Sequence, residues 1–158
     1  MKNFKKLAIV LMVLVLAASL VVGAVACAKK IGDKGTVTVV VESGKEGVAA
    51  TEYVVDLSKL SGNKGLVTVL DYLKENESLT CAISGGMLTE VNNLKNASDW
   101  NPYISLWTSV EADKAPAEDE YATNKEYKKY ALRSSNLGAL SMTIDDGAVI
   151  YIGYAYMS

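Results

Sequence analysis

Cys27 is the residue whose surroundings most clearly predict a chemical modification. Residues 1–6 carry three lysines, and residues 7–28 follow without a single charge. A basic start, an apolar stretch and small residues before a cut are the layout of an export signal. Ala24-Val25-Ala26-Cys27 resembles a bacterial lipobox, although its first position usually holds a larger aliphatic residue than alanine. A diacylglyceryl thioether on Cys27 would place two acyl chains in the membrane, which is enough for stable anchoring.

Two alternatives remain open at this junction. The small residues at 24 and 26 also suit an ordinary signal peptidase, which would give a secreted protein. The apolar stretch is also long enough to cross a bilayer as an uncleaved anchor. We favour the lipoprotein, with residues 1–26 as signal peptide, 27–34 as tether and 35–158 as one domain, located at the outer face of the cell membrane.

Cys81 is the other cysteine of the chain. Two cysteines in an exported protein suggest a disulfide, but acylation of Cys27 would leave Cys81 alone. It lies in the alternating stretch SLTCAIS, where we expect a buried thiol that behaves as a small apolar side chain. A catalytic thiol would need a neighbouring base, and the chain contains no histidine.

The absence of histidine excludes several classes of enzyme. Ser-His-Asp and Cys-His nucleophilic sites and His-ligated zinc sites all require it. Two cysteines are too few for a thiolate metal cluster. The acidic residues 118–120 and 145–146 lie in turn-like sequence, where we expect solvated charges. We therefore expect no catalytic residues, no metal and no cofactor other than a bound ligand.

The charge balance argues against nucleic acid as a partner. The chain has 16 basic and 18 acidic residues, and loss of the three leader lysines leaves 13 against 18, a net charge of −5. Nucleic acids and anionic lipid headgroups require clustered Lys and Arg. Only KEYKK at 125–129 is locally basic, and we expect it to form a solvated face.

Alternating and helical patterns predict an α+β domain built from antiparallel β-sheets and one short helix. Thr68 is expected to cap the helix, which ends at 74–76. The polar stretch 111–136 is expected to be an irregular excursion with a functional role or high mobility. The expected strands cover 36–43 and 50–58 as a hairpin, then 79–84, 87–94, 103–110, 140–144 and 148–157.

Three aromatic residues, Trp100, Tyr103 and Trp107, surround a polar turn and are the candidate ligand-binding residues. Their rings suit stacking on flat ligands or sugars. Alternation in 103–110 places Tyr103 and Trp107 on one face of a strand, opposite an apolar face. Both could equally be core residues, because large aromatic side chains are mostly buried. Trp100, in the turn, is the candidate we most expect to be exposed.

The order of these elements resembles the transcobalamin C-terminal-like domain family. The likeness covers about residues 35–157 and depends on the opening hairpin followed by TVLDYLKEN, GGMLTEVNNL, WNPYISLWTSV and MTIDDGAVIYIGY. Members occur in exported and surface proteins of Gram-positive bacteria and as the smaller β-domain of animal cobalamin carriers. In those carriers the β-domain closes over a corrinoid held against a separate helical domain.

The resemblance implies a non-enzymatic binding domain on a cell-surface lipoprotein. The ligand would be a corrinoid such as cobalamin, or another small molecule, passed on to a transporter or surface protein. This sequence has no helical partner domain, so the ligand would be held by this chain alone or with another protein. The alternative is a structural or adhesion module that makes protein–protein contacts through the tyrosine-bearing stretch 111–136.

Overall fold

The computed structural model describes residues 34–62 and 65–157, which form one α-helix, two 3-10 helices and nine strands. In chain order the elements are β1 (Thr36–Val41), β2 (Thr51–Asp56), η1 (Leu57–Lys59), α2 (Leu66–Asn76), β3 (Cys81–Ser84), β4 (Met87–Val91), β5 (Leu94–Lys95), β6 (Tyr103–Thr108), η2 (Glu111–Asp113), β7 (Asn124–Tyr127), β8 (Tyr130–Ser134) and β9 (Val149–Ala155).

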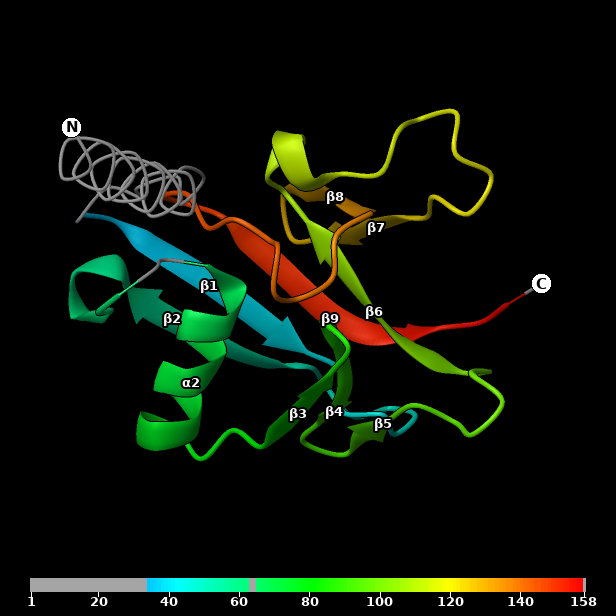
Figure 1. The fold of residues 1–158 in the computed structure, drawn as a ribbon, viewed down its shortest axis with the longest axis horizontal. Coiled ribbons are helices and arrows are strands. Elements are labelled where there is room, and N and C mark those ends of the chain that lie inside the picture. The colour runs from blue at the N-terminus through cyan, green and yellow to red at the C-terminus, as the bar shows by residue number, and fades with distance from the viewer. Residues whose placement is uncertain (1–33, 63–64, 158) are drawn as a thin grey trace, which may run out of the picture.

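The strands form two sheets, and the α+β class predicted from the sequence is confirmed (Figure 1). The larger sheet has the order β2-β1-β9-β6-β8-β7, and the smaller has the order β3-β4-β5. All neighbouring pairs are antiparallel except β1 and β9, which are parallel. The first and last strands of the domain therefore lie side by side in the middle of the larger sheet.

Both faces of the larger sheet are covered, which explains why β1 and β9 are so apolar. On one face, Val37, Val39 and Val41 of β1 pack with the buried side of α2 and with residues of the smaller sheet. On the other face, Val40 packs with Trp107 of β6 and Leu132 of β8. Strands buried on both faces read as continuous hydrophobic runs rather than alternating ones.

Strand β6 divides its side chains between these two cores, as its alternation predicts. Ile104 and Leu106 belong to the core beneath α2, whereas Tyr103 and Trp107 belong to the core on the opposite face. The alternating apolar and mixed faces expected for 103–110 are confirmed.

The predicted cap of the helix is wrong by three residues. The helix begins at Leu66 with Gly65 as its N-cap, so Thr68 lies inside the first turn. Gly65 bridges to Thr143, and the Leu66 N–H donates to the Met142 carbonyl. This tertiary contact provides a partner for one of the first N–H groups of the helix, which have no acceptor within the helix itself.

Two further segments differ from the sequence-based expectation. Residues 140–144 are not a strand, since only Thr143 forms a bridge, and Met142 and Ile144 are buried from a loop. The stretch 111–136 is not irregular throughout, because it contains η2 and the β7–β8 hairpin. In β7, exposed and half-buried residues alternate, which suits the polar sequence NKEY.

The predicted signal peptide, Cys27 and nearly all of the predicted tether lie outside the described residues. Within 34–62 and 65–157, no helix is long and apolar enough to cross a membrane.

Candidate functional site

A groove of about 780 Å³ lies where β6 extends beyond the end of β8. In Figure 1, β6 starts beside the end of β9 and runs towards the β7–β8 hairpin. Residues from six parts of the chain line the groove: Met87 and Leu88 of β4; Trp100; Tyr103, Ile104, Ser105 and Leu106 of β6; Glu120, Tyr121 and Thr123; Ser135, Asn136, Leu137, Gly138 and Ala139; and Tyr156 and Met157.

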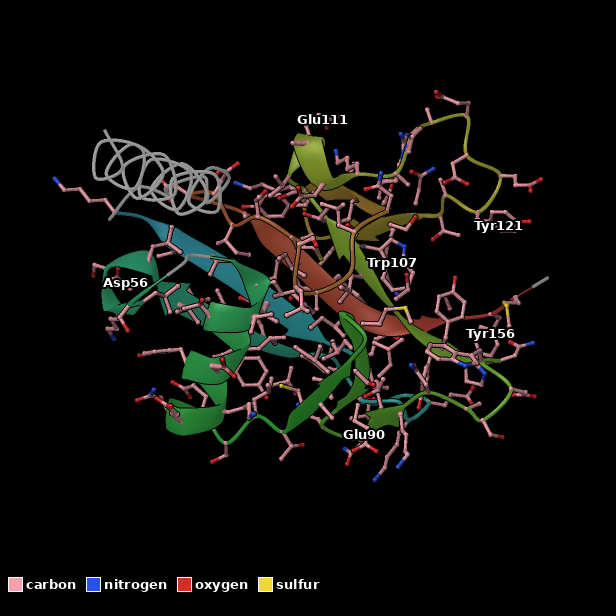
Figure 2. The ribbon with its side chains drawn as sticks, viewed as in Figure 1. Asp56, Glu90, Trp107, Glu111, Tyr121 and Tyr156 are labelled. Carbon is pink, nitrogen blue, oxygen red and sulfur yellow. The ribbon has the colours of Figure 1, made fainter. Side chains whose placement is uncertain are left out.

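The groove gathers exposed apolar side chains. Eight large hydrophobic side chains among the described residues are exposed, and five of them line this groove. Trp100 is 42% exposed, Tyr121 76% and Tyr156 70%, and two methionines, Met87 and Met157, complete the set. Figure 2 shows Tyr121 and Tyr156 on the same side of the molecule. A concentration of exposed apolar side chains is typical of a ligand or partner site.

The Trp100 side of the groove is held by a hydrogen-bonded turn. The Trp100 N–H donates to the Ala97 carbonyl, and the Asn101 N–H donates to the Asp99 carboxylate. The Asn101 side chain both donates to and accepts from the backbone of Met157. These reciprocal bonds fix the end of the chain beside the turn, so Trp100 and Tyr156 share one groove.

The opposite wall, residues 135–139, packs closely on the β3–β4 turn. A Cβ added at Gly138 would lie 2.5 Å from the Gly86 carbonyl oxygen. Only glycine permits this approach of two backbones, because the obstructing atom belongs to the main chain. The Ser135 hydroxyl also donates to the Asp113 carbonyl, which joins the wall to η2.

The three aromatic residues predicted from the sequence are divided by the fold. Trp100 and Tyr103 both line the groove. Trp107 does not: it is 4% exposed, belongs to the second core, and its indole N–H donates to Thr123 Oγ1 over 2.9 Å. Figure 2 shows Trp107 on β6, away from Tyr121 and Tyr156. The ligand-binding role of the two groove residues remains a prediction.

Sequence reasoning missed Tyr156 and the two groove methionines, and it placed Tyr121 only within the stretch 111–136 considered for protein–protein contacts. Tyr121 lies in a charged loop and Tyr156 follows the last strand, so neither has a periodic pattern that marks it. Their convergence depends on the packing of distant segments.

A second cluster surrounds Glu42, on the face of the larger sheet that carries Trp107 and Tyr151. Lys125 donates to Glu42 Oε1, and its ammonium lies 4.1 Å from the Tyr151 ring centroid and 4.5 Å from that of Trp107. The Tyr151 hydroxyl donates to the same carboxylate oxygen over 3.0 Å, and the Tyr154 N–H donates to Oε2. Lys125 was expected on a solvated face, but cation–π contacts and an ion pair hold it against the sheet.

The protonation states of this cluster suit a structural role. Burial acts to raise the pKa of Glu42, but hydrogen bonds from Lys125 and the Tyr154 N–H outweigh it and hold the pKa below its ordinary value. Burial, and then the Glu42 charge, raise the pKa of Tyr151. An ionised carboxylate and a neutral phenol with satisfied partners are poor proton carriers near neutral pH.

Cys81 is a free, half-buried thiol packed against the larger core, close to the apolar role expected for it. Burial raises the pKa of the thiol, so the nucleophilic thiolate is disfavoured. Cys81 does not line the groove. Over the described part of the chain, no group of three or more His, Cys, Asp or Glu side chains is arranged to hold a metal ion.

Comparison with known proteins finds no protein-family model and no curated protein that matches this chain.

Proposed function

We propose that this protein is a cell-surface lipoprotein whose folded domain binds a small ligand in the groove and performs no enzymatic reaction. The observation that carries the proposal is the gathering of exposed aromatic and methionine side chains around a single groove. Its volume falls within the range of about 300–1,000 Å³ that small-molecule sites occupy. One charged residue, Glu120, lines it, so the surface offered to a ligand is mainly apolar.

A corrinoid is the first ligand we propose. The resemblance to the transcobalamin C-terminal-like family suggests it, and the faces of Trp100 and Tyr103 suit a flat, largely apolar ring system. A groove covers only one side of such a ligand. A second protein, such as a transporter component, would then cover the other side and receive the ligand.

Replacement of Trp100 tests this proposal. Titration calorimetry of the full chain in mild detergent with cyanocobalamin should show binding, and Trp100→Ala should weaken it by about tenfold, the effect of losing one aromatic anchor. Val54→Ala is the matched control, because Val54 is an exposed apolar residue of β2 that does not line the groove. No binding heat at millimolar ligand, or equal affinities for Trp100→Ala and the wild type, would refute the corrinoid proposal.

The proposed anchor is tested at Cys27. We expect Cys27→Ala to move the protein from the membrane fraction to the soluble or secreted fraction, because the acylated sulfur is lost. Cys81→Ala is the control, since that thiol lies within the folded domain and should leave the location unchanged. Mass spectrometry of the mature protein should show a diacylglyceryl group at Cys27, and an unmodified thiol there would contradict the prediction.

One observation favours the alternative, protein–protein contact. Tyr121, in the stretch 111–136, is the most exposed aromatic side chain among the described residues and stands at the edge of the groove. Tyr is enriched at protein interfaces.

A further inference from the structure

Strand β6 has one edge that is only partly paired. Strand β9 pairs with every residue of β6 from Tyr103 to Thr108. Strand β8, on the other side, pairs only with Trp107 and Thr108. The first four residues of β6 therefore have a sheet neighbour on one side only, and the open side is where the groove lies.

The register identifies which backbone groups face this open side. The Ser109 N–H donates to the Val149 carbonyl, so odd-numbered residues of this segment direct their backbone groups towards β9. Even-numbered residues, including Ile104 and Leu106, direct theirs to the other side. In agreement, the Ser135 N–H donates to the Leu106 carbonyl over 2.7 Å.

Neighbouring segments satisfy part of this edge. The Ile104 N–H donates to the Asn96 side chain over 2.6 Å, and the Ala97 N–H donates to the Pro102 carbonyl. Two groups remain for which the described residues provide no hydrogen-bond partner: the Ile104 carbonyl and the Leu106 N–H. Both residues line the groove.

These two groups have the spacing of a parallel β-ladder. They belong to the residues on either side of Ser105, and one residue of an added parallel strand can bond both, with its own N–H to the Ile104 carbonyl and its own carbonyl to the Leu106 N–H. Unpaired backbone groups at a sheet edge are a template for strand addition. Apolar walls beside such an edge can then accept alternate side chains of the added strand.

We propose that the groove also captures an extended peptide segment of another protein, which adds to the open edge of β6 as a short parallel strand. This inference rests on the proposed function only in taking the groove as the binding surface. Apolar side chains of the peptide would contact the walls that include Trp100 and Leu137. Glu120 lines the groove next to Glu118 and Asp119, so the peptide carries a Lys or Arg beside its apolar residues.

A random heptapeptide library displayed on phage provides the probe. Selection on the immobilised full chain should enrich peptides that combine apolar or aromatic residues with a basic residue. Titration of an enriched synthetic peptide should show affinity weakened about tenfold by Trp100→Ala and unchanged by Val54→Ala. N-methylation of the one peptide amide that bonds to Ile104 should also cost about tenfold, whereas methylation of the next amide along should not.

Amide hydrogen exchange gives a readout of strand addition itself. Exchange of the Leu106 N–H should slow at least tenfold when the peptide binds, because that group gains a partner. The Ser105 and Trp107 amides face β9 and should be protected with or without peptide. Binding that leaves Leu106 exchange unchanged, or a library that yields no peptide dependent on Trp100, would overturn the inference.

The two ligands distinguish this inference from the proposed function. Binding of cyanocobalamin without enrichment of any peptide would overturn strand addition and support the corrinoid site. Peptide binding that slows exchange of the Leu106 amide, without any binding heat from cyanocobalamin, would support strand addition and overturn the corrinoid as ligand. Failure of both ligands would overturn the groove as a binding site.

Discussion

Glu42 follows the last residue of β1, and groups from two other strands meet at its side chain. Its carboxylate accepts hydrogen bonds from Lys125 of β7, and from the Tyr151 hydroxyl and Tyr154 N–H of β9. Gly153 leaves room for it, because a Cβ there would lie 2.4 Å from the carboxylate. Glu42 therefore joins the edge hairpin β7–β8 to the centre of the sheet.

We predict that Glu42→Gln destabilises the protein. Charge-assisted hydrogen bonds contribute more than neutral ones, and removal of the carboxylate charge would leave the half-buried Lys125 without its counter-ion, at a cost of about 2 kcal/mol in the free energy of unfolding. Urea unfolding followed by circular dichroism measures the change. Glu46→Gln is the control, since Glu46 is an exposed residue of the following turn. Equal loss in both variants would contradict this account.

Among the elements, η2 and the loop 139–147 are joined by one buried carboxylate. Asp113 is 2% exposed, and its Oδ2 accepts hydrogen bonds from the Thr143 N–H over 2.6 Å and from the Thr143 hydroxyl over 2.9 Å. These bonds satisfy backbone that would otherwise need a neighbouring strand. They explain why 140–144, which alternates like a strand, is a loop that buries Met142 and Ile144.

Asp113→Ala should destabilise the protein by about 2–3 kcal/mol, because the half-buried N–H and hydroxyl of Thr143 lose their carboxylate acceptor. Asp145→Ala, at an exposed position of the same loop, should change stability by less than about 0.5 kcal/mol. Thermal and urea unfolding of both variants test the difference. A stability of Asp113→Ala close to wild type would show that the loop does not depend on this carboxylate.

The elements with a local pattern were predictable, and those that depend on distant partners were not. Strand β1 is a run of β-branched residues, and α2 has apolar residues at helical spacing, so both could be located from the sequence. Strand β7 is the polar sequence NKEY, and it forms only because β8 folds back against it. The start of α2 at Leu66 likewise depends on a bond to Met142, far along the chain.

For the whole molecule, stability should be nearly constant between about pH 6 and 8, because the chain has no histidine to titrate there. Hydrogen bonds lower the pKa of Asp56 from its ordinary value of 3.8 and that of Glu111 from 4.5. The pKa values of Glu42 and Glu52 also lie below their ordinary value. A lowered carboxyl pKa contributes stability that is present above the ordinary value and is lost as pH falls through the folded value. We therefore expect acid destabilisation below about pH 4.5.

At alkaline pH the sign reverses. Hydrogen bonds to carboxylates raise the pKa of Lys95 and Lys128. Burial raises the pKa of Tyr151. The stability that these three protonated groups contribute is therefore fully present below about pH 10 and is lost as pH rises through their pKa values in the folded protein. Urea unfolding from pH 3 to 11 measures the loss of stability at both acidic and alkaline pH. Glu42→Gln should make the loss at acidic pH smaller. A stability change above about 1 kcal/mol between pH 6 and 8 would contradict the prediction.

The sequence by itself determined the α+β class, the alternating faces of β6 and the absence of histidine chemistry, because each depends on residue type or on spacing within one segment. Only the tertiary structure decided that β1 lies parallel to β9, that Trp107 is buried while Trp100 lines a groove, and that Lys125 stacks on two rings. Those features depend on segments as many as 112 residues apart, such as Glu42 and Tyr154. Local periodicity reports which side of a segment is buried, but packing of the whole chain decides what lies against it.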